Sequence, residues 1–191
     1  LGRLAALLLC LGILPSHAGQ TSAPSPQAAT VIVNAQVADG TGASLKSANV
    51  RIVADRIAKI GIFEPTKGDR VIDAKGLVLA PGFIDIHNHS AEGLSSDPLA
   101  ETQIAQGITT VILGPDGFSP WPIGTWLADR RKEPAALNLA LMVGHATVRK
   151  QVMGEDDERA ARPGEINQMA QRVDEAMHEG GIGRCSRLEY S

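Results

Sequence analysis

The sequence is poor in cysteine, in aromatic residues and in charge of one sign. Its two cysteines, Cys10 and Cys185, cannot form a framework of disulfides, and a zinc or redox motif of the CxxC type is excluded. Aromatic side chains make up 3% of the residues, which disfavours a surface that stacks nucleic-acid bases. Eighteen basic and 21 acidic side chains give a net charge of −3, so the sequence offers no electrostatic footprint for nucleic acid and no basic patch for a membrane surface.

Long hydrophobic runs are also scarce. The apolar run at residues 4–14 (LAALLLCLGIL) follows Arg3 and is shorter than the roughly 20 residues of a transmembrane helix. It precedes Ser16-His17-Ala18, a small-x-small triplet of the kind that signal peptidase accepts. We predict a signal peptide over residues 1–18 and export to the periplasm or the medium of a bacterium, with no stable membrane insertion after cleavage. Residues 19–29, rich in Pro, Ser and Gln, are predicted to form a disordered linker.

Residues 30–79 read as a series of short strands separated by turn signals. Apolar and polar residues alternate over the first of them, as in a half-buried strand, and Ala54-Asp55 separates two segments that read as a hairpin. Antiparallel-style strands at such short spacing favour a small β-sandwich segment. The predicted strands are residues 30–37, 49–53, 56–60, 71–73 and 77–79.

After Pro81 the pattern changes to an alternation of strands and helices, which predicts parallel βα units. The run at 108–113 (ITTVIL) is continuous and β-branched, typical of a strand buried on both faces. Apolar residues at helical spacing predict a helix that Gly180-Gly181 ends. The predicted elements are strands at 83–87, 108–113, 136–143 and from 182 onward, a loop and then a helix over 91–106, and a helix over 165–178.

The segment that carries chemistry is PGFIDIHNHS, residues 81–90. His87 and His89 are two positions apart, so in a strand their side chains project from the same face, where two imidazoles can bind a divalent metal. Asp85 lies on that face too and is expected to orient His87. The alternative is a pair of unrelated loop histidines. The turn and the apolar strand before the pair favour the metal site, because barrel active sites are built at strand ends.

Two later strand ends supply further candidate residues. Asp116 is a candidate metal ligand, because adjacent strands of a barrel bring their carboxyl ends side by side. The alternative is a plain turn, since Pro-Asp-Gly is a common turn triplet. His145 and Arg149 are candidates for binding an anionic group of a substrate or for supporting the metal site, although a lone histidine after a strand is more often a capping or packing residue.

Together these motifs resemble one family of enzymes. The run from Asp73 to His89 (DAKGLVLAPGFIDIHNH) is similar to the opening of enzymes of the amidohydrolase superfamily. Three later segments narrow the resemblance to the N-acyl-D-amino-acid deacylases, or D-aminoacylases, and the similarity runs from about residue 30 to residue 191. These segments are QGITTVILG at 106–114, VGH at 143–145 and EAMHEG at 175–180.

The resemblance implies a metal-bearing (β/α)8 barrel with a small β-sandwich made from both chain ends. The fold class expected for this chain is therefore α/β: the N-terminal portion of such a barrel over residues 80–191, with about four βα units, preceded by a β-sandwich segment over 30–79. A full barrel takes about 250 residues, and the sequence begins with Leu rather than Met. We expect an N-terminal fragment that is inactive alone, with further histidine ligands and the aspartate that acts as general base beyond residue 191.

The resemblance also implies an activity, the hydrolysis of the linear amide of a small N-acyl-D-amino acid. His87 and His89 would bind zinc, as one or two ions, and zinc lowers the pKa of a bound water to about 7. The best-known members carry cysteine at the position of Asp116, and a carboxylate is a harder ligand. Two alternatives stay open: another amidohydrolase, dihydroorotase-like or dipeptidase-like, and a non-catalytic binding protein of the cell envelope whose metal site has decayed.

Residues 184–187 (RCSR) depart from the family's pattern, which usually has Leu and Gly where this sequence has Arg184 and Arg187. Arginines inside a barrel strand are costly unless they reach solvent or partners. A sequencing error or a local shift of the reading frame is a hypothesis for these four residues.

Overall fold

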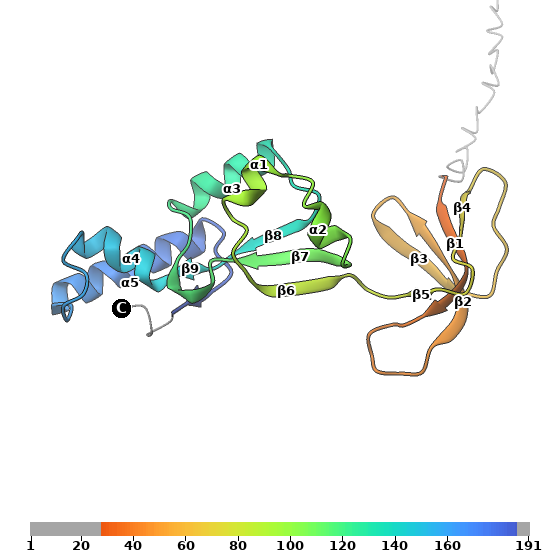
Figure 1. Ribbon diagram of the computed structural model, residues 1–191, viewed down its shortest axis with the longest axis horizontal. Coiled ribbons are helices and arrows are strands. Elements are labelled where there is room, and N and C mark those ends of the chain that lie inside the picture. Colours follow the sequence, from red (N-terminus) through yellow and green to blue (C-terminus); the bar gives the residue numbers. More distant parts are fainter. Residues whose placement is uncertain (1–27, 187–191) are drawn as a thin grey trace, which may run out of the picture. The chain divides into compact units, whose positions relative to one another are not determined.

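The computed structural model describes residues 28–186 (Figure 1). The chain divides into two compact units, one up to Ala80 and one from Pro81. The predicted signal peptide at 1–18 and nearly all of the predicted linker at 19–29 lie outside the described residues and stay predictions. Within the described part, no helix has both the length and the apolar character needed to cross a membrane.

The first unit is one sheet of five strands with β1 at its centre. β2 pairs with one side of β1, and β3 pairs with the far side of β2. β4 and β5 pair with the other side of β1. The strands are β1 (Thr30–Val37), β2 (Lys46–Val53), β3 (Arg56–Gly61), β4 (Arg70–Asp73) and β5 (Val78–Leu79). The described residues of this unit form no second sheet, so the second layer of a sandwich is not among them.

The pairing of β4 and β5 differs from the expectation. β1, β2 and β3 are antiparallel, with the predicted hairpin at Ala54-Asp55, but β4 and β5 run parallel to β1. The physical reason is the length of the connection after β3: residues 62–69 carry the chain across the sheet instead of turning it back on itself. The antiparallel prediction was therefore wrong for these two strands.

An ion pair ties that connection to the sheet. The guanidinium of Arg51 on β2 donates to both carboxylate oxygens of Asp69, at 2.6 and 2.8 Å, and the backbone N–H of Thr66 donates to Asp69 at 2.7 Å. The hydrogen bonds from Arg51 and Thr66 lower the pKa of Asp69 from 3.8 to about 2. The Asp69 side chain is only 2% exposed, so these bonds fix the loop against β2.

We expect the substitution Asp69→Asn to lower the free energy of unfolding of the first unit at neutral pH. A carboxyl whose pKa is depressed in the folded state adds stability above its unfolded pKa, here near 3.8, and this contribution disappears as the pH falls to about 2. The variant should therefore lose less stability than the wild type over that pH interval. Urea unfolding followed by circular dichroism at each pH measures this. Asp55→Asn is the control, because the Asp55 and Arg56 side chains are 82% and 85% exposed, and equal pH profiles for Asp69→Asn and wild type would contradict the prediction.

The second unit contains five strands, and β8 and β9 both lie within the one strand predicted over 136–143. β6, β7 and β8 form a parallel sheet in that order, and β9 pairs parallel with β10. A backbone hydrogen bond from Ile182 to Leu141 (3.0 Å) joins the two sets, and one from Val143 to Gly183 (2.8 Å) extends the pairing of β9 to the residue before β10. This arrangement confirms the predicted parallel strands. They are β6 (Phe83–Asn88), β7 (Ile108–Leu113), β8 (Asn138–Leu141), β9 (Val143–Gly144) and β10 (Arg184–Cys185).

The helices of this unit agree only partly with the expectation. The helix predicted over 165–178 is present, but residues 91–106 form two short helices and a loop instead of one helix, and two helices over 123–132 and 145–153 were missed. The elements are α1 (Gly93–Ser96), α2 (Glu101–Ile104), the 3-10 turn η1 (Pro115–Gly117), α3 (Ile123–Lys132), α4 (His145–Met153) and α5 (Pro163–His178).

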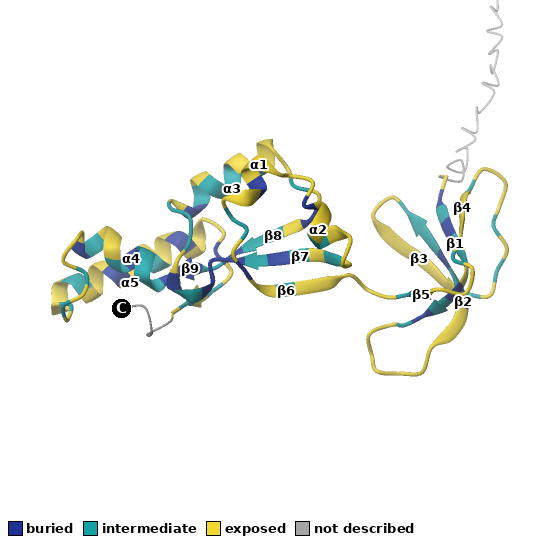
Figure 2. Cartoon of the chain, in the orientation of Figure 1, coloured by how far each residue is buried: buried dark blue, intermediate teal, exposed yellow. Residues whose placement is uncertain are grey.

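The core of the second unit combines buried apolar side chains of β7, β8 and β9 with others from the helices. Val111, Leu113, Leu141 and Val143 are fully buried, which agrees with the continuous apolar run of β7. β6 is different: its side chains Phe83, Ile84 and Ile86 are 61–68% exposed, and Figure 2 shows nearly the whole strand as exposed. β6 is therefore an exposed edge strand of this sheet, and its pairing with the buried strand β7 fixes its position.

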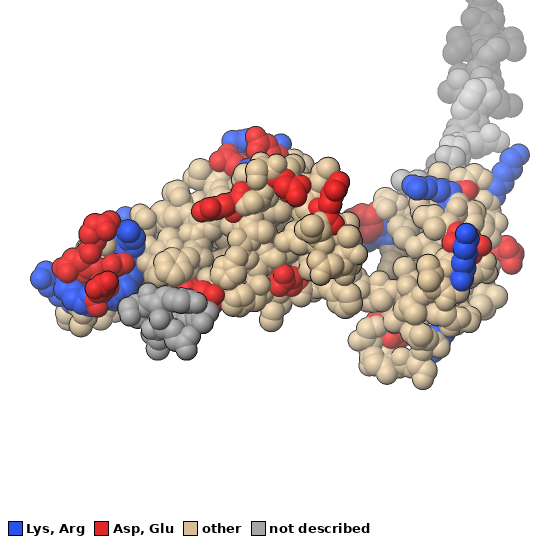
Figure 3. All heavy atoms as spheres, viewed as in Figure 1, with Lys and Arg blue, Asp and Glu red and all other residues tan. Residues whose placement is uncertain are grey.

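Charged side chains of both signs gather over α4 and α5 (Figure 3). Arg159 joins the loop between these helices to α5, with contacts of 2.6 Å to both Asp156 and Glu165. Glu165 also accepts a hydrogen bond from the backbone N–H of Arg162 at 2.7 Å, which caps the first turn of α5. The intermingled charges therefore serve local pairing in this part of the unit.

Candidate metal centre

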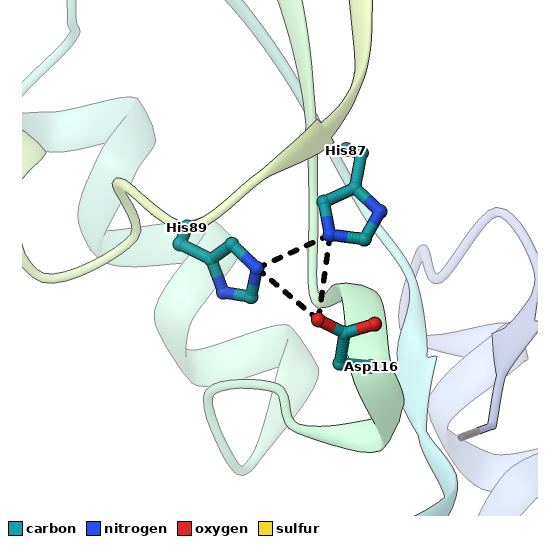
Figure 4. Close-up of side chains that lie close together, drawn as sticks. All are labelled: His87, His89 and Asp116. Carbon is teal, nitrogen blue, oxygen red and sulfur yellow. Dashed lines mark hydrogen bonds and ion pairs between the residues drawn. The ribbon is translucent and has the colours of Figure 1, made fainter. Parts of the chain in front are cut away.

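Adjacent parallel strands bring the candidate ligands together. His87 lies in β6 and His89 directly after it, while Asp116 lies in η1, directly after β7. The pairing of Asn88 with Leu113 places the ends of β6 and β7 side by side. Figure 4 shows the three side chains pointing toward one another from these two strand ends.

The three ligand atoms form a triangle with equal sides. Nε2 of His87 and Nε2 of His89 are 3.3 Å apart, and each lies 3.3 Å from Oδ2 of Asp116. The two imidazole rings meet edge to face, at 61° and with 5.2 Å between their centroids. The histidine side chains are 58% and 65% exposed and that of Asp116 is 15% exposed, so the centre opens on its histidine side.

The turn after β7 aims Asp116 at the histidines. Asp116 has φ = 56° and ψ = 23°, in the left-handed region that Asp adopts more readily than most residues. Gly114 before it also has a positive φ, of 79°. The interpretation of Pro-Asp-Gly as a turn and the interpretation of Asp116 as a ligand are therefore compatible, because the turn itself presents the carboxylate to the neighbouring strand.

Asp85 and Asn88 fix the backbone that carries the two histidines. Asp85 accepts hydrogen bonds from the side-chain amide of Asn88 at 2.8 Å and from the backbone N–H of His87 at 3.1 Å, and both bonds lower its pKa. Asn88, 8% exposed, accepts from the backbone N–H of Ser90 at 2.9 Å. Asp85 thus contacts the backbone of His87 and not its imidazole, which corrects the role expected for it, and Asn88 is a positioning residue that the sequence analysis missed.

The triangle has the size that a tetrahedral zinc site requires. A regular tetrahedron with an edge of 3.3 Å has its centre about 2.0 Å from each corner, and Zn²⁺ binds imidazole nitrogen and carboxylate oxygen at about 2.0–2.2 Å. Two imidazoles and one carboxylate are also a donor set that zinc accepts, with the fourth position left for water or substrate. These three residues, which form a group able to hold a metal ion, therefore fit the implied cofactor.

His145 and Arg149 lie in a different place from this triangle. They line a pocket of about 520 Å³, together with Arg184 and residues of α5. Arg184 donates to Nδ1 of His145 at 2.9 Å, and burial, together with the charges of Arg184 and Arg149, lowers the pKa of His145. The guanidinium of Arg149 donates to the backbone carbonyls of Asp157 and Arg159. Both side chains thus have structural partners, and their substrate role stays a prediction.

Arg184 shows how an arginine is accommodated at this strand. Its side chain is exposed and has His145 as a partner, so it meets both conditions under which such a residue is tolerated. Arg187 lies outside the described residues.

Comparison with known proteins agrees with the geometry. The sequence pattern of the amidohydrolase family matches residues 70–186, which is more than half of the chain. The chain belongs to this family.

The relatives of this amidohydrolase include enzymes that act on N-acyl-D-amino acids by name. The chain is 35% identical over 187 residues to an N-acyl-D-aspartate deacylase of Alcaligenes xylosoxydans xylosoxydans, a match that covers 86% of this chain and 37% of the relative. A D-aminoacylase of the same organism is 35% identical over 175 residues, with 80% and 36% covered. The chain thus spans little more than a third of the length of these relatives.

A solved structure agrees with the fold of this amidohydrolase. The N-acyl-D-glutamate deacylase of Bordetella bronchiseptica, in complex with zinc and a phosphonate inhibitor that mimics the tetrahedral reaction intermediate, has a TM-score of 0.78 and 28% identity. The match covers 84% of this chain and 38% of that protein. The α/β fold class is confirmed: the second unit is a part of the barrel of these enzymes.

Proposed function

We propose that this protein hydrolyses the linear amide bond of N-acyl-D-amino acids with zinc as its cofactor. The observation that carries the proposal is the 3.3 Å triangle of two imidazoles and one carboxylate at the ends of adjacent barrel strands. The relatives named as deacylases of N-acyl-D-amino acids support the substrate class. Because the chain spans little more than a third of their length, the proposal concerns the whole protein.

Each residue of the centre has a part in this reaction. His87, His89 and Asp116 hold the metal, and Asp85 and Asn88 keep the two histidines on one side of the strand end. The exposed histidine side of the centre leaves room for the amide to approach. A zinc ion held by these residues would supply Lewis-acid polarisation of the amide carbonyl and would lower the pKa of a bound water to about 7. We place the general base outside the described residues.

The activity is tested with protein expressed from its complete reading frame. We expect faster hydrolysis of N-acetyl-D-amino acids than of the L-enantiomers, loss of activity on treatment with a chelator, and recovery on addition of Zn²⁺. The measurement is the release of free amine with time. Hydrolysis of cyclic ureides in place of linear amides would contradict the proposal and favour a dihydroorotase-like activity. A purified protein that holds no metal and cleaves neither class of substrate would contradict it too and favour the alternative of a non-catalytic binding protein.

A further inference from the structure

A pocket of about 650 Å³ lies beside the metal centre in the second unit. Its walls come from the segment after β6, the segment after β7, and single residues of α3 and α4, and His89 is one of its lining residues. A substrate bound to the metal centre would therefore extend into this space. The volume is in the range of about 300–1,000 Å³ that small-molecule sites occupy.

We propose that this pocket receives an uncharged, apolar group of the substrate and excludes an acidic one, an inference that rests on the proposed function. Six of the thirteen lining residues have aromatic or apolar side chains, which gain free energy by covering an apolar group. Both tryptophans of the chain are among them. The apolar lining residues are Ala91, Pro115, Phe118, Pro120, Trp121 and Trp126.

Three polar side chains of the lining, Asn88, Ser119 and Thr147, have hydrogen-bond partners within the protein. Asn88 donates to Asp85 and accepts from Ser90. Thr147 accepts from the backbone N–H of Ser119 at 2.9 Å and donates to its carbonyl at 3.2 Å. The hydroxyl of Ser119 accepts from the backbone N–H of Gly144 at 3.0 Å. These bonds occupy the donors of Asn88 and Thr147, so neither side chain is available to replace the water shell of a carboxylate.

The charge of the lining also opposes an acidic group. Among the described residues that line the pocket, none is Lys or Arg, and Glu92 carries a negative charge. The nearby Arg130 lies 6.0 Å from the ring centroid of Trp126 and pairs with Glu133 at 3.1 Å, and it is not a lining residue. A carboxylate that leaves water without a cationic partner loses free energy, so an aspartate or glutamate side chain is disfavoured here.

The two tryptophans make the pocket directly measurable. We would titrate the chain with N-acetyl-D-leucine and with N-acetyl-D-aspartate, whose side chains differ little in size, and follow tryptophan emission with and without Zn²⁺. We expect both ligands to be distinguished by this titration, with a dissociation constant for N-acetyl-D-leucine at least tenfold lower than that for N-acetyl-D-aspartate. A third ligand, N-hexanoyl-D-aspartate, shows which part of the substrate enters the pocket. If it binds more tightly than N-acetyl-D-aspartate, the pocket receives the acyl chain. If it binds as weakly as N-acetyl-D-aspartate, the pocket receives the amino-acid side chain.

A charge reversal tests the cause of the preference. Glu92 is exposed, so the variant Glu92→Arg should fold. It should reduce the ratio of the two dissociation constants severalfold, because the new guanidinium can pair with the side-chain carboxylate of N-acetyl-D-aspartate. Glu101→Arg is the matched control, because Glu101 is an exposed acid of α2 that does not line the pocket. The Glu101→Arg variant should show the same ratio of the two dissociation constants as the wild type.

The outcomes separate this proposal from the proposed function. Equal or tighter binding of N-acetyl-D-aspartate, or emission that neither ligand changes in a chain shown to be folded by circular dichroism, would overturn the pocket assignment. If the protein binds zinc and cleaves N-acyl-D-amino acids while aspartate binds as well as leucine, only the pocket assignment fails. If leucine is preferred but no zinc binds, the proposed function fails and the pocket assignment stands.

Discussion

Replacing both histidines of the centre, His87→Ala together with His89→Ala, is expected to raise the dissociation constant for Zn²⁺ more than about 100-fold, because changes to groups that merely support a ligand already cost 10–100-fold. Only Asp116 would remain of the three ligands, and one partly buried carboxylate holds zinc weakly. Competition with a chromophoric chelator measures the constant. Hydrolysis of N-acetyl-D-amino acids by the whole protein should fall in parallel.

The matched control for this pair is His178→Ala. His178 is 79% exposed and its imidazole contacts Asp174 on the same helix, α5, so the loss of this ring should leave zinc affinity unchanged. Circular dichroism should show equal folding of both variants, because the side chains of His87 and His89 are more than half exposed. Zinc binding by the double variant at wild-type strength would refute the metal centre.

The second large effect is expected from Gly144→Ala, at the junction of β9 and α4. A Cβ at this position would lie 2.4 Å from the backbone oxygen of Gly117, and Gly117 follows Asp116 in η1. All three atoms nearest to this Cβ belong to the backbone of Gly117 and Phe118, so η1 has to move. We expect a loss of about 1–3 kcal/mol in the free energy of unfolding, measured by urea unfolding followed by tryptophan emission.

The same substitution should also weaken zinc binding at least tenfold, since ligands have to be held within about 0.5 Å of the productive geometry. Gly183→Ala is the control. Gly183 lies in the neighbouring segment, before β10, and a Cβ there has no atom within 4 Å, so stability and zinc affinity should both stay near the wild-type values. If Gly144→Ala kept wild-type zinc affinity, the contact with Gly117 would not be what positions Asp116.

Local patterns sufficed where the structure follows a local period. Strand β1 and strand β7 have the bounds predicted from alternation and from the β-branched run, because side-chain direction in a strand repeats every two residues. The same period places His87 and His89 on one side of the strand end. The helix α5 also follows from its apolar spacing and from the glycines that end it.

The missed helices had weaker local signals. α3 carries Ile123, Trp126 and Leu127 at helical spacing, a short pattern that a closer search would find. α4 begins at His145, where only a strand end was expected, and it contains the β-branched residues Thr147, Val148 and Val152, which lower helix propensity. Its formation depends on packing, since Val148 is buried in the core.

The family, the parallel βα pattern and the histidine pair can be predicted without a structure, because these depend on residue type and on spacing along the chain. Only the tertiary structure decided that Asp116 faces both histidines, that Asp85 bonds to backbone, that His145 and Arg149 line a different pocket, and that both tryptophans lie beside the metal centre. The physical reason is that these relations join residues far apart in sequence. They are fixed by the register of adjacent strands and by close backbone contacts, which no local pattern encodes.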